Sequence, residues 1–369
     1  MFAANRYGLS GTVEPMYRLL NWPGASLALL SALLFGASTP VAKLLLGEGV
    51  SAWSLAGLLY LGSGIGLGLV HLISRAFGLR SREASLRRSD LPWLALVIVS
   101  GGVVGPVLLM IGLTITPASW ASLLLNLEAL ATMLIAWIVF RENVDRPLVI
   151  GAAAILAGAV LLSWRGGPEG FGPGALAIAV ACLAWGIDNN LTRKISAADP
   201  VQIALIKGLA AGSVNSVLAL VAGATFPSTP QLRGALLVGF FGYGVSLVLF
   251  VLGLRHLGAA RTGAYFSTAP FIGAVISIVM FDEPITARLL AAGLLMAFGV
   301  YLHLSETHEH EHEHDPLEHE HRHVHDDHHH HAHGPDDPVG EPHTHWHRHA
   351  PIRHKHPHYP DLHHRHEHA

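Results

Sequence analysis

The chain has 369 residues, of which 51% are hydrophobic and 13% are charged, whereas a soluble domain carries about 25% charged residues. This composition argues against a soluble enzyme and indicates a membrane protein. Its charge is uneven, because 14 of 26 acids and 24 of 27 histidines follow Leu304. The single cysteine, Cys182, excludes a disulfide within the chain. Residues 1–24 are too polar for a signal peptide, and we expect them to form an N-terminal cytoplasmic segment.

Ten apolar runs follow one another along the body, each of about the length that a helix needs to cross a bilayer. Their linkers are short, so no polar face remains for water, and helices buried in a soluble core do not fit the pattern. The sequence therefore predicts an all-α membrane protein with ten transmembrane helices. They are expected at Ala25–Leu46, Trp53–Ile73, Leu91–Ile115, Ala118–Phe140, Leu148–Trp164, Gly174–Thr192, Pro200–Ala222, Gly234–Leu254, Thr262–Phe281 and Ile285–Leu304.

The two halves of the body resemble each other. At an offset of 150, Leu33 and Gly36 meet Leu183 and Gly186. Five spans per half is an odd number, so the second half enters the bilayer from the opposite face and the repeat is inverted. We expect a first repeat at 25–164, a second at 174–304 and a tail at 305–369. At an offset of 141, Val107, Leu108, Gly112, Leu113, Ala118, Phe140 and Glu142 meet Val248, Leu249, Gly253, Leu254, Ala259, Phe281 and Glu283.

Basic residues in the linkers predict the orientation, because Lys and Arg resist translocation. One side of the membrane receives thirteen of them and the other side three, which places both termini in the cytoplasm. The larger set is Arg6, Arg18, Arg75, Arg80, Arg82, Arg87, Arg88, Arg141, Arg146, Arg193, Lys194, Arg255 and Arg261, and the smaller set is Arg165, Arg233 and Arg288.

Several motifs resemble one transporter family. They are LFGASTPVAKLLL at Leu34–Leu46, AWGIDNNLTRKI at Ala184–Ile195, FRE at Phe140–Glu142 and FDEP at Phe281–Pro284. Together with the ten runs, they make residues 25–304 similar to the EamA-type family of the drug/metabolite transporter superfamily. The resemblance implies a bacterial inner-membrane permease that works by alternating access, with amino acids, other metabolites and drugs among its cargoes. The tail departs from the family pattern.

Glu128 lies near the centre of the fourth run, where an acidic side chain costs about 2.5–3.5 kcal/mol. Trp120, Leu124 and Glu128 recur at i, i+4 spacing, so they share a helix stripe that we expect to face inward. The echo of Glu128 at an offset of 141 is Ala269, so the acid is confined to one half. We interpret it as a proton- or cation-responsive site, and a structural ion pair with a lysine is the alternative.

Two lysines lie within apolar runs. Lys207 has Gln202 and Asn215 nearby in the seventh run, and it could bind an anionic group of a cargo, snorkel, or pair with Glu128. Lys43 lies near the end of the first run, where snorkelling is favoured over a role in binding, and an ion pair with Glu128 is its other alternative.

Polar residues in the fourth, sixth and ninth runs complete the predicted substrate site. Asp188 and Asn189 lie late in the sixth run, where either an interface or a cavity-lining role fits. Asn126 and Tyr265 could line the same cavity, although Asn126 lies about 200° around the helix from Glu128. The predicted substrate-binding residues are Glu128, Lys207, Asp188, Asn189, Asn126, Tyr265, Trp120 and Lys43.

The tail cannot bury an apolar core, and we expect it to be disordered without ligand. Neutral imidazole binds Ni, Zn, Co and Cu well, so the composition predicts several exchangeable metal sites. A pH-responsive polyelectrolyte or an expression tag is the alternative. The predicted ligands are His308, His310, His312, His314, His319, His321, His323, His325, His328, His329, His330, His331, His343, His345, His347, His349, His354, His356 and His358.

The first functional hypothesis is a secondary transporter of small solutes, in contact with lipid, that requires no cofactor and carries a tail that binds divalent transition metals. A Ni, Co or Zn permease is the rival within transport, and a membrane-anchored metal sensor or storage protein is the rival outside it. The chain lacks a P-loop and a nucleophile motif, so we do not expect an enzyme, and nothing in it indicates nucleic-acid binding. A homodimer is compatible with the sequence.

Overall fold

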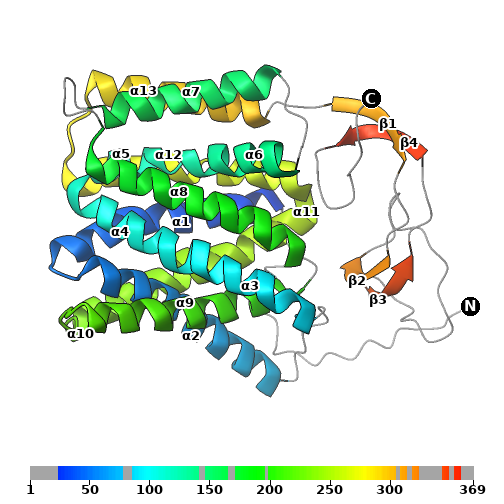
Figure 1. The fold of residues 1–369 in the computed structure, drawn as a ribbon, viewed down its shortest axis with the longest axis horizontal. Helices are drawn as coiled ribbons and strands as arrows, with labels where there is room; N and C mark the ends of the chain where they lie inside the picture. Colours follow the sequence, from blue (N-terminus) through cyan, green and yellow to red (C-terminus); the bar gives the residue numbers. More distant parts are fainter. Residues whose placement is uncertain are drawn as a thin grey trace, which may run out of the picture.

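The computed structural model describes residues 24–77, 85–140, 146–164, 171–195 and 198–304, and in the tail 308–313, 318–323, 343–348 and 353–358. The body is a bundle of helices that run side by side (Figure 1). Its helices are α1 Gly24–Gly47, α2 Ala52–Ala76, η2 Arg88–Asp90, α3 Leu91–Val97, η3 Ile98–Val104, α4 Gly105–Ile115, α5 Ala118–Leu124, α6 Leu127–Phe140, α7 Arg146–Ser163, α8 Pro173–Thr192, η5 Arg193–Ile195, α9 Pro200–Val221, α10 Thr229–Val238, η6 Gly239–Val245, α11 Ser246–Phe266, α12 Ala269–Phe281 and α13 Ala287–Leu304.

Within the described part of the chain, nine helical stretches are long and apolar enough to cross a membrane, and α12 is a shorter apolar helix of 13 residues. The predicted ninth span also includes the end of α11. The rings of Phe250 and Phe266 have centroids 4.8 Å apart, whereas 16 residues of straight helix would separate them by about 24 Å. Because α11 doubles back on itself, Phe266 belongs to the ninth span together with α12.

The two halves contain the same helical irregularity at the same place. A π-helix occupies Ile98–Val104 in the first half and Gly239–Val245 in the second half, and the two segments are separated by the 141 positions found in the sequence. The fourth span breaks at Leu125–Asn126 and the ninth breaks at Ser267–Thr268. The prediction of an all-α membrane body built from two repeats is confirmed.

Contacts between the halves occur in matching pairs. In the first half α1 packs on α11 and α12, and in the second half α8 packs on α4 and α6. On the side of the bundle opposite α7 and α13 (Figure 1), α2 packs on α9, where Gly64 and Gly208 allow the backbones to touch. A Cβ atom on Gly208 would lie 2.6 Å from the amide nitrogen of Gly64. Small residues at such crossings are the usual means by which helices associate in lipid.

Each of the two ends of the bundle is named after an acidic residue that lies there. The Glu283 end holds the turns after α1, α4, α9 and α12, and the Asp199 end holds the turns before α3 and α9. These ends lie at the left and right of Figure 1, respectively.

The described tail residues form four short strands: β1 His308–Glu313, β2 Glu318–His323, β3 His343–Arg348 and β4 Arg353–His358. β1 pairs with β4 and β2 pairs with β3, both antiparallel. The alternation of histidine with other residues has the two-residue period of a strand. The sequence predicts disorder throughout the tail without ligand, and these four segments differ from that expectation; other tail residues lie outside the described ranges.

Candidate functional site at the centre of the bundle

An ion pair joins helices α8 and α9. The ammonium group of Lys207 in α9 donates to the carboxylate of Asp188 in α8. The side chains are 16% and 6% exposed, respectively, and the other carboxylate oxygen of Asp188 accepts a 3.0 Å hydrogen bond from the Thr192 hydroxyl. The structure therefore pairs Lys207 with Asp188, so the alternative in which Lys207 pairs with Glu128 does not hold in this conformation.

Asp188 lies directly against the backbone of the π-helix η3. A Cβ atom on Gly101 would be 1.9 Å from Oδ2 of Asp188, so only glycine fits at this position. In a π-helix the backbone hydrogen bonds join residues five apart instead of four, as in the bond from the Gly105 amide to the Ser100 carbonyl. The carbonyl of Gly101 accepts hydrogen bonds from the Tyr60 hydroxyl at 2.7 Å and from Nε1 of Trp185 at 2.9 Å. These contacts fix η3 beside the ion pair.

Glu128 lies in the first turn of α6 and contacts α8. Nδ2 of Asn189 donates to Oε1 of Glu128 at 3.0 Å and to Oγ1 of Thr132 at 3.1 Å. Among the described residues, no basic side chain forms an ion pair with Glu128. Asp188, Lys207, Glu128, Asn189 and Thr132 are called the central polar site below. Its formal charge is −1, because it has two carboxylates and one ammonium group.

The other predicted substrate residues lie elsewhere. Nδ2 of Asn126 donates to the carbonyl of Leu123 at 2.8 Å and lies 3.8 Å from Sδ of Met296, so the side chain is directed toward α13. Tyr265 lies in the last turn of α11, where its carbonyl accepts from the Thr268 hydroxyl. Neither residue joins the central polar site.

Lys43 and Trp120 lie toward the Glu283 end. The ammonium group of Lys43 donates to the carbonyl of Thr116 at 3.0 Å and to that of Leu113. A cation at the end of α4 complements the negative end of the helix dipole. Lys43 thus caps a helix, which excludes an ion pair with Glu128 in this arrangement.

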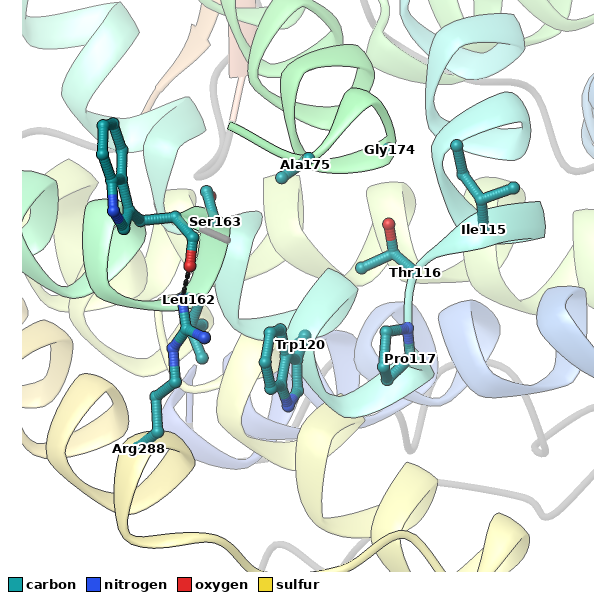
Figure 2. A pocket seen from close by; sticks show the side chains of 11 residues that line it. Ile115, Thr116, Pro117, Trp120, Leu162, Ser163, Gly174, Ala175 and Arg288 are labelled. Carbon is teal, nitrogen blue, oxygen red and sulfur yellow. Dashed lines mark hydrogen bonds between the residues drawn. The ribbon is translucent and has the colours of Figure 1, made fainter. Parts of the chain in front are cut away.

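Trp120 lines a pocket of about 430 Å³ at the Glu283 end. The guanidinium of Arg288 lies 5.2 Å from the centre of its indole ring, and Figure 2 shows the two side chains at one edge of the pocket. Sequence reasoning included Trp120 but missed Arg288, which was counted only as a linker charge.

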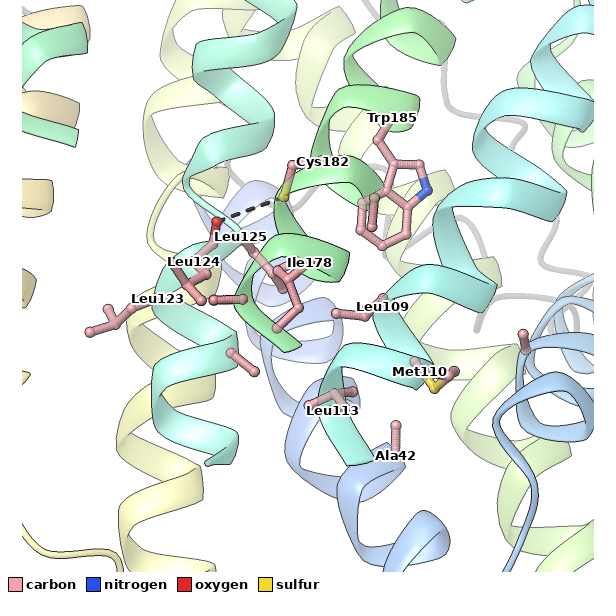
Figure 3. Packing of buried hydrophobic residues seen from close by; sticks show 14 of the residues in the cluster. Ala42, Leu109, Met110, Leu113, Leu123, Leu124, Leu125, Ile178, Cys182 and Trp185 are labelled. Atoms are coloured by element: carbon pink, nitrogen blue, oxygen red, sulfur yellow. Dashed lines mark hydrogen bonds between the residues drawn. The ribbon is translucent and has the colours of Figure 1, made fainter. Parts of the chain in front are cut away.

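An apolar layer separates this pocket from the central polar site. Along α8, Gly174 lines the pocket and Asp188 belongs to the polar site, and Ile178 and Cys182 lie between them in the helix. Both side chains are fully buried, and Leu124 of α5 is 1% exposed. Figure 3 shows these three residues packed together, with the Cys182 thiol 3.7 Å from the Leu124 carbonyl oxygen. Leu124, Ile178 and Cys182 are called the apolar plug below.

Sequence reasoning missed the residues that hold the backbone of η3. Tyr60 and Trp185 are aromatic residues within apolar runs, and nothing in their spacing distinguishes them from packing residues. Asn215 was noted as a neighbour of Lys207, but its Nδ2 donates to the carbonyl of Gly102 at 3.0 Å. The available signal was the glycine pair Gly101–Gly102, which permits close approach of other helices.

The predicted metal ligands are placed only as backbone positions. His314, His325, His328, His329, His330, His331 and His349 lie outside the described residues. The others occupy the four strands, where histidine faces histidine across each pair. The opposed positions are His308 and His358, His310 and His356, His312 and His354, His319 and His347, His321 and His345, and His323 and His343. Among the residues that the structure describes, no cluster of three or more His, Cys, Asp or Glu side chains could hold a metal ion.

Comparison with known proteins agrees with the fold and its internal repeat. The chain is 27% identical over 286 residues to an uncharacterized transporter of Methanothermobacter thermautotrophicus, which covers 74% of this chain and 83% of the relative. It is 23% identical over 246 residues to a probable terminal-alkyne amino-acid exporter of Streptantibioticus cattleyicolor, with 65% and 83% covered. A solved crystal structure with 21% identity superposes with a TM-score of 0.55 over 75% of this chain and 95% of that one.

The model of the EamA-like transporter family matches twice, over residues 22–164 and 172–305. The two matches cover both halves of the body, each with its own π-helix. The predicted family is therefore confirmed: the chain belongs to the EamA-like transporter family and is a multi-pass membrane transporter.

Proposed function

We propose that this chain is a secondary transporter that moves a small zwitterion of the amino-acid type by alternating access through the central polar site. The observation that carries the proposal is the Lys207–Asp188 ion pair beside Glu128, at the interface of the two repeats. Ionisable groups within membrane spans are costly and mark substrate or ion pathways. The amino-acid cargo named for the Streptantibioticus relative belongs to the same chemical class.

The charges of the site fit a zwitterion. Glu128 offers a carboxylate without a described cationic partner, to which an ammonium group can bind. Lys207 offers an ammonium group to a carboxylate, and Asn189 adds an amide that already orients Glu128. A bound zwitterion adds no net charge to the site. A proton and the ammonium group would compete for Glu128, and this competition couples solute flux to proton flux.

The described conformation fits a state closed toward the Glu283 end, because the apolar plug lies between that end and the central polar site. Asn189 is exposed, and it lies about 160° around α8 from Ile187, a side chain that is 40% exposed on the lipid-facing side. Asn189 therefore faces away from lipid. We infer that solute reaches the site from the Asp199 end in this state, and that rearrangement of the two repeats opens the other end.

The excess of Lys and Arg assigns the ends. In the topology predicted from the sequence, thirteen basic linker residues fall on one side of the membrane and three on the other. The described members of the larger set, such as Arg87 and Arg88, lie next to helices at the Asp199 end, so we infer that this end and both termini lie in the cytoplasm of a bacterial cell. The protein would then lie in the plasma membrane with Glu283 on the outer face.

The experiment is counterflow in proteoliposomes with radiolabelled amino acids, comparing the wild-type protein with Glu128→Gln and Lys207→Gln. Both substitutions should reduce counterflow at least about tenfold, because each removes a charge-assisted contact. Glu48→Gln is the matched control, since Glu48 is an exposed acid in the turn after α1. Counterflow that persists undiminished in both site variants would exclude the central polar site as the route.

The same vesicles distinguish the proposed function from a metal permease and from a metal sensor or storage protein. For this purpose, radioactive nickel, cobalt and zinc are supplied in place of the amino acids. Metal flux that Glu128→Gln abolishes would identify a metal permease and overturn the amino-acid proposal. Absence of any flux from a folded, reconstituted protein would favour a sensor or storage role.

We also propose that the tail binds divalent transition metals in the cytoplasm. The specific observation is the strand register, in which histidines oppose one another at three positions in each pair. Directly opposed residues in antiparallel strands have Cβ atoms about 4.5–5.5 Å apart, a spacing that lets two imidazoles share one ion. On the alternate positions Glu311 opposes Lys355 and Glu318 opposes Arg348, which favours the same register.

Equilibrium dialysis with nickel or zinc tests this part. The full chain should bind several ions, and a chain that ends at Leu304 should bind none at the same free concentration. Equal binding by the two proteins would contradict a metal site in the tail.

A further inference from the structure

The pocket at the Glu283 end has the size and lining of a small-molecule site. Its volume of about 430 Å³ lies within the range of ligand sites, about 300–1,000 Å³. Apolar side chains such as Leu162 and Ile115 share its wall with the hydroxyls of Thr116 and Ser163 and with Arg288. Figure 2 shows these groups around one space, which lies between the ends of α4 and α7 and the beginnings of α5, α8 and α13.

Arg288 supplies the pocket's charge. Its Nε donates to the carbonyl of Leu161 and its Nη2 to that of Trp164, so it is held at the end of α7. A guanidinium has five N–H donors, and these two bonds leave others for a ligand. Within the described part of the chain no carboxylate forms an ion pair with Arg288. Among the described residues, the pocket therefore presents a fixed positive charge without a carboxylate partner.

The indole of Trp120 defines the second part of a ligand. Arg288 lies over its face at 5.2 Å, which holds the ring in position through a cation–π contact. An aromatic wall beside a guanidinium suits a molecule with an apolar body and an anionic oxygen group, because arginine binds carboxylates with two parallel hydrogen bonds.

The pocket is connected with the central polar site through shared helices. Trp120 precedes Glu128 by eight residues along α5 and α6, which corresponds to about 12 Å of helix. Ala175 in the pocket wall and Asp188 lie on α8. The apolar plug lies between the two sites along these elements, so the solute can pass between them only when this packing rearranges.

We propose that this pocket is an outer binding site, which holds the carboxylate and the apolar part of the solute on Arg288 and Trp120 as it enters or leaves at the Glu283 end. The inference rests on the proposed function, since it assigns the same zwitterion to a second position on its route. It does not require the central polar site to be occupied at the same time.

The first test measures binding without transport. Purified full-length protein in detergent is titrated with 4-nitrobenzoate, which quenches tryptophan fluorescence, and with the uncharged 4-nitrobenzamide. We expect saturable quenching by the acid alone, a loss of affinity of about tenfold or more in Arg288→Gln, and unchanged affinity in Glu48→Gln, which removes an exposed acid. Equal quenching by acid and amide would overturn the pocket's assignment even if counterflow is intact.

The second test distinguishes a role of Arg288 in solute binding from its structural role at the end of α7. The half-saturating concentration of the best counterflow substrate is measured from each side in vesicles of known orientation. Arg288→Gln should raise it about tenfold from the Glu283 side and leave the other side unchanged, and Arg288→Lys should retain part of the affinity. A fall in maximal rate from both sides, with equal half-saturation and a lower melting temperature, would show a structural role only.

Lipid is the remaining occupant to exclude. The titration is repeated in nanodiscs with and without phosphatidylglycerol, whose phosphate offers the same anionic oxygens. Unchanged 4-nitrobenzoate affinity supports the solute site. Full displacement by the lipid would assign the pocket to a headgroup and overturn the proposal.

Discussion

Glu283 and Ala118 lie 165 positions apart in the sequence and are joined by a 2.7 Å hydrogen bond, from the Ala118 amide to Oε1 of Glu283. Oε2 accepts the Ser119 amide at 3.0 Å and the Ser119 hydroxyl. A carboxylate at a helix N-terminus satisfies free amides and complements the helix dipole. Because Glu283 follows α12 and Ala118 begins α5, one side chain fastens the second repeat to the first.

Glu283→Gln should lower the stability of the purified protein by about 0.5–2 kcal/mol, the usual effect of losing a helix cap. The side-chain oxygen of the glutamine can still accept a hydrogen bond, but the side chain no longer carries a negative charge. Thermal unfolding followed by tryptophan fluorescence measures the effect, with Glu48→Gln as the control at the same end. Equal melting temperatures for the two variants would show that the cap does not hold the repeats together.

Gly101→Ala should abolish transport. The added methyl group would lie 1.9 Å from Asp188, so the carboxylate must leave its place beside Lys207 or η3 must move. Gly68→Ala is the control, because its Cβ would meet only the Leu205 side chain, at 3.8 Å. That variant should keep full counterflow and gain slightly in helix propensity. Counterflow by Gly101→Ala at the wild-type rate would contradict the described packing of η3.

Because Lys207 and Asp188 form an ion pair, we expect the losses of stability in their two single variants to be strongly non-additive. Asp188→Asn or Lys207→Gln alone leaves an uncompensated charge in a largely buried place, which costs about 3–5 kcal/mol. The double variant removes both charges and should recover much of the stability without recovering transport. Chemical or thermal unfolding of all four proteins gives the coupling energy. Additive losses would mean that the two side chains do not interact in the membrane.

Removal of the tail after Leu304 should leave the transporter's affinity for solute unchanged. The tail strands pair with one another, and α13 ends at Leu304. Counterflow by the shortened chain, measured with and without added zinc, checks this. A shift in half-saturation without metal would show that the tail takes part in solute binding.

Much of the fold follows from the sequence because lipid imposes simple rules. A span must be apolar and helical, so the ten spans, the two repeats and the family could be predicted. The contacts between individual side chains were predicted less well. The sequence placed Glu128 and Asp188 within the same candidate site, yet it left Lys207 with several partners, because helix periodicity does not say which helices are neighbours.

Most of the side-chain positions that the sequence did not predict depend on irregular backbone. The break at Leu125–Asn126 changes the direction of side chains along the fourth span, and Asn126 turns toward Met296 rather than toward the central polar site. The π-helix η3 releases the carbonyl of Gly101 to Tyr60 and Trp185. An extra residue in one helical turn leaves no mark in apolar composition, so these two partners could not be predicted.

The matching π-helices at Ile98–Val104 and Gly239–Val245 also bear on the ancestry of the chain. A π-helix arises when a turn carries one residue more than an α-helix accommodates. Since both copies lie at the same offset, the additional residue belonged to the five-helix unit before that unit was duplicated. The charged residues of the central polar site are not shared in this way, because Glu128 of the first half aligns with Ala269 of the second. The polar site is therefore asymmetric, although the irregular backbone beside it is present in both halves.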